Sequence, residues 1–340
     1  MDDRSVRDRL TAVRDPDLES DIVDLGLVRD VTIADDRITV DLALAAAGSP
    51  TEEAIAREAE TALDGIAETV EIRRGGLGSE DRRTDALGQI TNVVAVASGK
   101  GGVGKTTVSA NLAAGLADRG ASVGLFDADV YGPNAPMMLG ESTTPEVTDD
   151  EQLIPPEADG VKVMSMAYLV GEDDPVIWRG PMVHQVITQL WDDVRWGELD
   201  YLIIDLPPGT GDTQLTLLQT IPLTGAVIVT TPQDVSLHDA TKGLEMFARH
   251  ETVVLGIVEN MAGFRCPDCG SVHEIFDAGG GAALAERHQL PFIGSIPLDP
   301  AVRASDRPAV LADDGTAGDA FRRIAAEVAD TVGIVNRRRA

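Results

Sequence analysis

The chain has little positive charge. Its 340 residues carry 28 lysines and arginines against 57 aspartates and glutamates, which gives a formal net charge of −29. Lysine occurs only at positions 100, 105, 162 and 242. A protein that binds nucleic acid needs a basic face that displaces counterions from phosphates. The charge balance therefore argues against nucleic-acid partners.

The same acidity says more about the solvent than about the function. Like charges on one chain repel each other, and this repulsion is screened to a few ångströms only near molar salt. We interpret the surface as adapted to a salt-rich cytoplasm, in the manner of halophilic archaea. An ordinary acidic protein is the alternative interpretation.

Long apolar runs and cysteines are also scarce. No stretch approaches the ~20 consecutive apolar residues of a membrane span, and the start, Met1 to Leu10, is charged. We therefore expect no secretory signal, no membrane partner and a cytoplasmic location. The two cysteines, Cys266 and Cys269, have Cys-x-x-Cys spacing, which in a reducing compartment indicates metal or redox chemistry rather than a disulfide.

The first 75 residues have the pattern of a small α+β domain. Apolar residues at helical spacing predict helices over Ser5–Val13 and Thr51–Leu63, with Thr51 as a possible N-cap. Extended segments are expected at residues 22–31, 37–42 and 68–72. Two domains also agree with the length of the chain.

Residues 76–90 mix glycine with both charge signs and predict a linker. Beyond them, apolar runs typical of buried parallel strands alternate with helical patterns. We therefore expect a doubly wound α/β domain, with a mainly parallel sheet, over residues 91–335. The predicted strands lie at residues 92–97, 122–126, 201–204, 226–230, 253–258 and 292–296.

A glycine-rich loop with the Walker A spacing Gly-x4-Gly-Lys-Thr follows the first of these strands. In such a loop, backbone N–H groups converge on phosphate oxygens at the start of a helix. Lys105 is expected to reach the β and γ phosphates, and the Thr106 hydroxyl to bind Mg²⁺. The nucleotide-binding residues predicted here are Gly99, Lys100, Gly101, Gly102, Val103, Gly104, Lys105, Thr106 and Thr107.

Lys100 departs from the general Walker A loop. The segment Lys-Gly-Gly-x-Gly-Lys-Thr-Thr resembles the deviant Walker A of the MinD, ParA and nitrogenase iron protein class. This resemblance implies a homodimer that encloses two nucleotides, in which Lys100 reaches into the partner's site. A cation supplied in trans can raise phosphoryl transfer by ~10³–10⁵. Lys100 and Lys105 are therefore candidate catalytic residues, and a merely solvated Lys100 is the alternative.

Other segments fit the same class. Asp127-Ala128-Asp129 resembles switch I and Asp205 resembles the Walker B aspartate, each directly after a predicted strand. The resemblance implies that Asp129 orients or deprotonates the attacking water. Asp127 and Asp205 would lie near Mg²⁺, which usually keeps several waters. Plain helix caps are the alternative for these carboxylates.

Asn260 belongs to Glu259-Asn260-Met261, which resembles the base-recognition element of the class. An asparagine amide can pair with the adenine edge, since it is both donor and acceptor. Pro297, after the last strand, could pack on the same ring. The resemblance alone predicts ATP rather than GTP.

The two cysteines cannot complete a metal centre by themselves. Tetrahedral zinc and cubane clusters each need about four ligands. The others must come from a second copy of the chain, from a histidine such as His273, or from an exogenous thiol. A symmetric dimer would supply four cysteines at its axis. From the spacing alone, a structural zinc knuckle is favoured over an iron–sulfur cluster.

Nearly the whole chain resembles the Mrp/ApbC family of iron–sulfur cluster carriers. Besides the segments above, the resemblance covers Trp178–Met182, Gln214–Thr216 and Asp277–Gly281. It implies a [4Fe-4S] cluster that bridges two subunits through Cys266 and Cys269. It also implies ATP-coupled transfer of this cluster to apo-proteins.

The N-terminal segment adds a second resemblance. Asp15-Pro16-Asp17 followed by Ile22–Val28 resembles the small domain of iron–sulfur assembly factors that is often fused to these ATPases. Many such domains have a cysteine before proline, where this chain has Ser49. Serine is a poor ligand for soft metals, so we expect this domain to bind a client or steer the ATPase without a metal.

A positioning ATPase like MinD or ParA is the alternative function. That role needs a membrane-seeking amphipathic helix or a basic DNA-binding face. Residues 320–340 have helical spacing and a basic end but no large aromatic or leucine-rich face. The sequence therefore favours the cluster carrier.

Overall fold

The computed structural model describes residues 2–75, 89–130, 132–140, 143–169, 191–266, 269–276, 278–300, 302, 307–312 and 315–340. These residues form two compact units, Met1–Thr91 with Ala326–Ala340 and Asn92–Ala325. Most of the predicted linker, residues 76–88, lies outside the described residues. The predicted domain boundaries therefore stay predictions.

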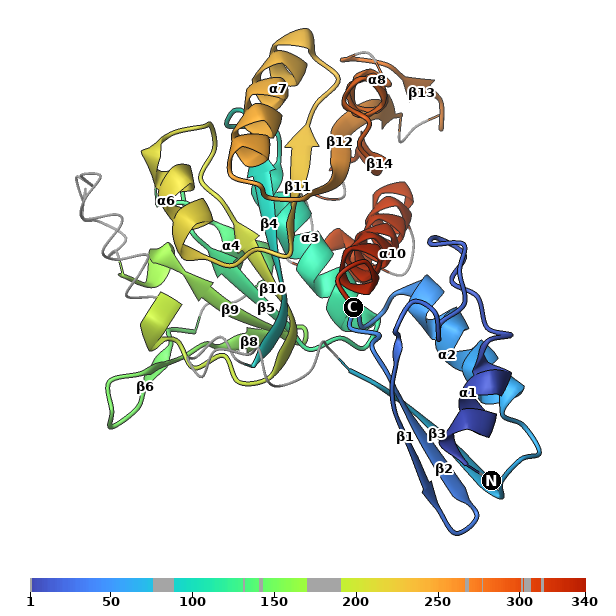
Figure 1. Ribbon diagram of the computed structural model, residues 1–340. Coiled ribbons are helices and arrows are strands. Elements are labelled where there is room, and N and C mark those ends of the chain that lie inside the picture. The colour runs from blue at the N-terminus through green and yellow to red at the C-terminus, as the bar shows by residue number, and fades with distance from the viewer. Residues whose placement is uncertain are drawn as a thin grey trace. The chain divides into compact units, whose positions relative to one another are not determined.

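The first unit packs α1 (Asp3–Leu10) and α2 (Pro50–Ala62) against a small sheet (Figure 1). The strands are β1 (Val28–Ala34), β2 (Arg37–Leu42) and β3 (Thr69–Arg74). β2 pairs antiparallel with β1 and parallel with β3. Apolar side chains from both helices and the sheet, such as Leu10, Val40 and Ile55, are buried together. This is the α+β arrangement that the sequence predicts.

The expected strand over residues 22–31 is only partly present. Residues 22–26 form turns, and β1 begins at Val28. The Asp21 carboxylate accepts the N–H groups of Val23 and Asp24, which holds the chain in a turn. This local side-chain contact outweighs the β propensity of the apolar residues around it.

The predicted N-cap of α2 lies two residues after the observed one. The helix begins at Pro50, and the Ser49 hydroxyl accepts the N–H of Glu52. Proline suits the first helical position because its fixed φ is already helical and its missing N–H needs no partner. Ser49 is therefore the cap, and the assignment of this role to Thr51 was wrong.

The last turns of α10 (Thr316–Arg337) belong to the first unit. The Arg337 side chain is fully buried and forms ion pairs with Asp15 at 2.6 Å, Asp17 at 2.7 Å and Glu52 at 3.2 Å. The Asp330 carboxylate accepts the Ser49 hydroxyl and, at 3.0 Å, the N–H of Thr51. The two ends of the sequence thus share one fold.

The second unit is built on a mainly parallel sheet, and over the described residues this sheet has nine strands. Their order is β13-β12-β11-β4-β10-β5-β9-β8, and β14 also pairs with β12. β8 and β13 pair antiparallel with their neighbours, whereas β14 joins β12 in parallel. The strands are β4 (Ile90–Ser98), β5 (Val123–Asp127), β8 (Glu157–Ala158), β9 (Val161–Ser165), β10 (Leu199–Asp205), β11 (Gly225–Thr230), β12 (Val254–Arg265), β13 (Val272–His273) and β14 (Phe292–Leu298).

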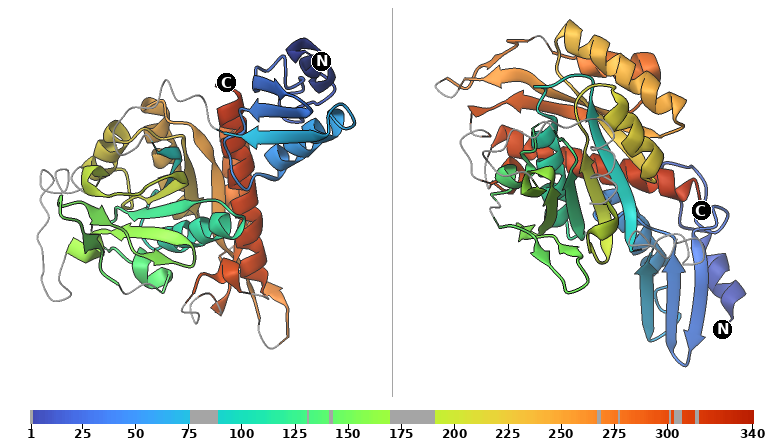
Figure 2. Two further views of the ribbon diagram at one scale, coloured as in Figure 1. Left: turned by 90° about the horizontal axis from the view of Figure 1, so that it is seen from below. Right: turned by 90° about the vertical axis from the view of Figure 1, so that its left-hand side faces the viewer.

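Helices alternate with the parallel strands, as the two views of Figure 2 show for this unit. They are α3 (Lys105–Asp118), α4 (Ala135–Met138), α6 (Asp212–Thr220), α7 (Asp234–Arg249), α8 (Gly280–His288), the start of α10 and the 3-10 turns η1 (Met166–Leu169) and η2 (Ala309–Leu311). A separate hairpin joins β6 (Glu146–Val147) to β7 (Leu153–Ile154). This confirms the predicted doubly wound α/β architecture. No helix among the described residues is long and apolar enough to cross a membrane.

The six strands predicted for this unit are all present, and two differences matter for the site. β9 was not predicted, and it lies beside β5 in the sheet. β12 continues past its predicted end at Val258 to Arg265, so it carries Asn260 and reaches the first cysteine. Because parallel strands share one carboxyl edge, the segments after β4, β5, β10 and the middle of β12 meet there.

Candidate functional site

The phosphate loop connects β4 to α3 and has the backbone shape that its glycines allow. Gly102 and Gly104 have φ angles of 80° and 82°, which few other residues adopt. A Cβ at Gly99 would lie 2.2 Å from the backbone of Asp239, so α7 approaches the loop too closely for a side chain. No side chain caps the start of α3. Its first N–H groups are therefore available to an anion.

Lys105 and Asp205 form the centre of the site. The Lys105 ammonium lies 2.8 Å from the Asp205 carboxylate and 3.7 Å from that of Asp129, and its side chain is only 6% exposed. Asp205 is fully buried and also accepts the hydroxyls of Thr106 at 2.7 Å and Ser109 at 2.6 Å. The sequence analysis named Lys105, Asp205, Asp129 and Thr106 as site residues, and the structure brings them together. It did not name Ser109. Ser109 lies one turn after Lys105, so helical spacing was the signal that could have found it.

Asp127 fastens the segment after β5. Its carboxylate accepts the N–H groups of Asp129 at 3.1 Å and Ala135 at 3.0 Å, and the Ser165 hydroxyl at 3.1 Å. Burial, and then the negative charge of Asp205, raise the pKa of Asp127 to about 7. Ser165 was missed because it ends the unpredicted strand β9.

The carboxylates of Asp129 and Asp205 lie 3.7 Å and 2.8 Å from the Lys105 ammonium group, and the charge of Lys105 also acts on the nearby Asp127 carboxylate. This excess of negative charge, together with the Thr106 hydroxyl, fits a divalent cation such as Mg²⁺. No group of three or more histidine, cysteine, aspartate or glutamate side chains gathers as a metal cage among the described residues. Magnesium needs no such cage, since one or two carboxylates, substrate phosphates and water usually complete its shell.

Asn260 lies against the phosphate loop. Its amide nitrogen donates to the Val103 carbonyl at 2.8 Å, and a Cβ at Gly104 would lie 2.2 Å from the same nitrogen. Asn260 pairs with Ile296 across β12 and β14, which places Pro297 next to it on the neighbouring strand. Asn260 thus lies beside the loop, and Pro297 lies on the strand that pairs with the strand of Asn260.

Lys100 lies apart from the Lys105 centre, near α7. The pKa of Asp239 is lowered mainly by its hydrogen bond from Lys242, with a smaller contribution from the charge of Lys100. Lys100 is half-buried, and its carbonyl accepts the Ser98 hydroxyl at 3.0 Å. The charge of Lys100 thus acts on Asp239 of α7, whereas the ion pairs of Asp129 and Asp205 described above are with Lys105.

The segment after β10 is tied to the phosphate loop. The N–H of Gly209 donates to the Ser98 carbonyl at 3.0 Å, and the buried Gln214 amide donates to the Pro207 carbonyl. A change at the phosphates can therefore reach this segment through main-chain contacts.

The cysteines lie at the turn between β12 and β13. Arg265 pairs with Val272, the Cys266 N–H donates to the Ser271 carbonyl at 2.9 Å, and the Gly270 N–H donates to the Cys266 carbonyl at 2.9 Å. Both cysteines are free, and Cys269 is exposed. Its thiol donates to the Ser271 hydroxyl at 3.3 Å, and hydrogen bonding with Ser271 lowers the pKa of Cys269. The lowered pKa favours the thiolate, which is the form that binds soft metals.

His273 lies on β13 but does not form a three-ligand group with the cysteines among the residues that the structure describes. Some residues that the sequence analysis singled out lie outside the described residues. These are Tyr131, Trp178–Met182 and residues 267, 268 and 277.

Two family models cover most of the chain. A family described as NUBPL iron-transfer P-loop NTPase matches residues 89–329, and one described as iron-sulfur cluster assembly protein matches residues 3–73. The iron-sulfur cluster carrier protein of Synechocystis sp. is 43% identical over 340 residues, covering 96% of each chain. That of Deinococcus radiodurans is 44% identical over 343 residues, covering 98% of this chain and 96% of the relative.

Solved structures resemble about two thirds of the chain. A nucleotide-binding protein from Archaeoglobus fulgidus in complex with ADP is 40% identical with a TM-score of 0.58, over 68% of this chain and 90% of that protein. The cell division ATPase MinD of Pyrococcus furiosus is 27% identical with a TM-score of 0.52, over 70% and 98% of the two chains.

Proposed function

The chain belongs to the NUBPL iron-transfer P-loop NTPase family, and from this premise we propose that it is an ATPase that carries iron–sulfur clusters and delivers them to apo-proteins. The observation that supports this most directly is that one sheet bears both an open phosphate loop and a hairpin with two free cysteines. The proposed location is a salt-rich cytoplasm.

ATP binds with its phosphates at the uncapped start of α3. Lys105 exchanges its ion pair with Asp205 for the β and γ phosphates, so the buried ammonium group keeps a negative partner. Thr106 and Asp205 would hold Mg²⁺, with Asp127 near it. When bound, this ion neutralises charge that develops on the phosphates. Asp129 orients the attacking water, while Asn260 and Pro297 receive the adenine.

The cluster is cargo that two copies of the chain hold together. Cys266 and Cys269 supply two thiolates, and a cubane cluster needs four. A two-fold dimer provides the second pair and also brings Lys100 of each copy to the nucleotide of the other. We therefore propose a homodimer with one bridging [4Fe-4S] cluster.

The first unit carries no metal in this proposal and instead binds clients or steers the ATPase. Ser49 is fully buried, caps α2 and donates to Asp330. Its hydroxyl is thus committed to protein partners, and it lacks the thiolate that a soft metal prefers. The double variant Cys266→Ala/Cys269→Ala should retain neither iron nor zinc, and metal on it would contradict this assignment.

Anaerobic reconstitution tests the carrier function. The full chain is incubated with iron and sulfide in high salt, and iron, sulfide and zinc are then measured per dimer. The proposal expects about four irons and four sulfides per dimer, as in one cubane cluster. Cys266→Ala should lose them, because two remaining thiolates cannot hold the cluster. Tightly bound zinc with no iron uptake would instead indicate a structural knuckle on a positioning ATPase.

Lys100→Ala tests the contribution in trans. We expect ATP hydrolysis to fall by about 10³-fold or more, as for loss of an arginine finger, and cluster transfer to an apo-protein to stop. Arg249→Ala, which removes a positive charge from the exposed end of α7, is the control and should hydrolyse ATP normally. Unchanged transfer in Lys100→Ala would remove this lysine from the mechanism.

A further inference from the structure

The Glu259 carboxylate joins the two ends of the chain segment that carries the cysteines. Glu259 is 1% exposed, and its two oxygens accept the N–H groups of Gly279 at 3.0 Å and of Gly281. These donors lie at the start of α8, ten and twelve residues beyond Cys269 in the sequence. A Cβ at Gly281 would lie 2.9 Å from the Cβ of Glu259, so glycine is what allows this approach.

The next residue of the same strand contacts the nucleotide site. Asn260 donates to the Val103 carbonyl of the phosphate loop at 2.8 Å, and its side-chain oxygen accepts the N–H of Met261. Consecutive residues of β12 therefore contact the start of α8 and the phosphate loop. Cys266 follows directly after the end of this strand at Arg265.

Between Asn260 and the cysteines, β12 departs from regular geometry. Met261 has a φ of 60° and Gly263 a φ of 79°, and the register with β14 shifts between Asn260 and Phe264. A left-handed backbone is unfavourable for a residue with a side chain, and such conformations persist where the surrounding structure enforces them. Regular pairing then resumes with β13 at Phe264 and Arg265.

We propose that Glu259 is a positioning residue that makes the cysteine hairpin respond to the nucleotide site. This inference rests on the proposed function, because it takes Asn260 as the adenine contact and the cysteines as the cluster ligands. An adenine base that accepts the Asn260 amide withdraws it from the Val103 carbonyl, and the irregular stretch from Met261 to Gly263 transmits the displacement toward the cysteines. Since Glu259 fixes the base of the segment to α8, the displacement moves the hairpin instead of spreading into a loose loop.

The test measures how nucleotide alters the hold on the cluster. Reconstituted full-length protein is mixed with a ferrous chelator, and iron release is followed with and without a saturating non-hydrolysable ATP analogue. We expect the analogue to change the wild-type release rate about five-fold or more, the lower end of typical coupling between sites. In Glu259→Gln, which leaves one good acceptor for two N–H groups, this ratio should fall toward one.

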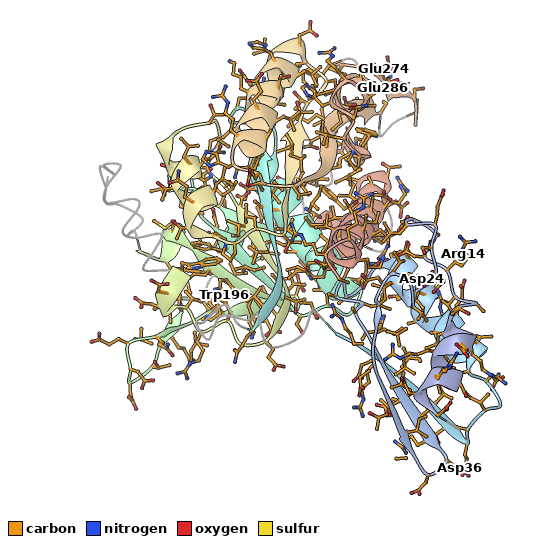
Figure 3. All side chains as sticks on the ribbon, in the orientation of Figure 1. Arg14, Asp24, Asp36, Trp196, Glu274 and Glu286 are labelled. Carbon is orange, nitrogen blue, oxygen red and sulfur yellow. The ribbon has the colours of Figure 1, made fainter. Side chains whose placement is uncertain are left out.

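Glu274→Gln is the matched control, because Glu274 is exposed after β13 on the same segment and loses the same charge (Figure 3). It should keep the wild-type ratio. Glu259→Asp, which retains both oxygens with a shorter reach, should give an intermediate ratio and is the second variant if Glu259→Gln does not fold. Wild-type coupling in both Glu259 variants would overturn the inference and leave the carrier function intact.

A second readout does not depend on the cluster. In Cys266→Ala, alkylation of Cys269 is timed with and without the same analogue, alone and combined with Glu259→Gln. The inference expects the analogue to change the labelling rate only when Glu259 is present. If the wild type takes up no iron, the carrier function fails, and labelling still decides whether Glu259 couples the two sites. If the analogue leaves the labelling rate unchanged although Glu259 is present, the inference is overturned.

Discussion

The Asp127 carboxyl group shows how packing in a binding site changes the pKa of a side chain. It is 0% exposed, and burial is the largest cause that raises its pKa to about 7, ahead of repulsion by Asp205. Two backbone N–H groups and the Lys105 charge act in the opposite direction. Near neutral pH, Asp127 can therefore be protonated in the nucleotide-free protein, and a divalent cation would favour its ionised form.

This pKa predicts a pH dependence of stability. Between about pH 4 and pH 7 the folded protein keeps a proton on Asp127 that the unfolded chain releases, so the free energy of unfolding falls as pH rises. The contribution to the slope is at most about 1.4 kcal/mol per pH unit. Asp127→Asn should lose this slope in urea unfolding without nucleotide or Mg²⁺, whereas the exposed Asp24→Asn (Figure 3) should keep it. Equal slopes in all three proteins would contradict the assignment.

At the same scale, the sequence predicted the residues that a spacing rule defines. Lys105, Thr106 and Asp205 meet as expected because the Walker A loop and a strand-end aspartate have fixed positions in this fold. Ser165 and Glu259 could not be predicted in this way. Their partners lie far along the chain, and only the packing of β9 on β5 and of α8 on β12 brings them together.

Among the elements, α2 and α10 depend on each other. Ser49 caps α2 and donates to Asp330 of α10, while Arg337 of α10 neutralises Asp15 and Glu52. Burial is the largest cause that raises the pKa of Glu52, and the nearby Arg337 charge counteracts it. A buried carboxylate tolerates its charge only because this cation is present.

Removing that cation should be costly. Arg337→Ala leaves buried carboxylates without their partner, and breaking a buried pair costs about 3–5 kcal/mol. Denaturation of the full chain should therefore show the first unit unfolding at lower urea concentration. Arg338→Ala, which removes an exposed arginine from the adjacent position, is the control and should change stability little. An unfolding midpoint equal to that of the control would mean that the ion pairs contribute little.

The strands that were predicted well are those in which buried apolar residues follow one another in the sequence. β4, β10 and β11 are buried over most of their length, and each contains a run of at least four consecutive apolar residues in the sequence. β9 was missed because it is short and interrupted by Lys162, whose ammonium group donates to the Trp196 carbonyl (Trp196 is labelled in Figure 3). The extension of β12 was missed because its continuation contains left-handed residues that resemble a loop in sequence.

For the molecule as a whole, charge is the dominant surface property. A net charge of −29 on 340 residues makes like-charge repulsion a destabilising term that acts over the entire surface. Salt shortens its range from ~10 Å at 0.1 M to ~3 Å at 1 M. The described ion pairs of exposed residues, such as Arg73 with Glu71, relieve only a small part of it.

Stability should therefore rise with salt. We expect the midpoint of urea unfolding to increase between about 0.1 M and 1 M KCl, because the screening length falls over this range to less than the spacing of most surface charges. Urea is chosen because it is uncharged and does not itself screen. A variant with several exposed aspartates changed to asparagine should need less salt to reach the same midpoint. A midpoint that is independent of KCl would reject the adaptation to a salt-rich cytoplasm.

The ion pair between Arg337 and Asp15 also has a consequence for how the protein is made. The two residues are 322 positions apart, yet both are buried in the first unit. Domains generally fold as they leave the ribosome, N-terminal part first. Here Asp15 and Glu52 emerge long before residue 337 is translated, so these buried carboxylates must wait for their cation. The nascent first unit thus remains incomplete during translation, which gives chaperones a defined species to protect and makes translation through residue 337 a requirement for its native core.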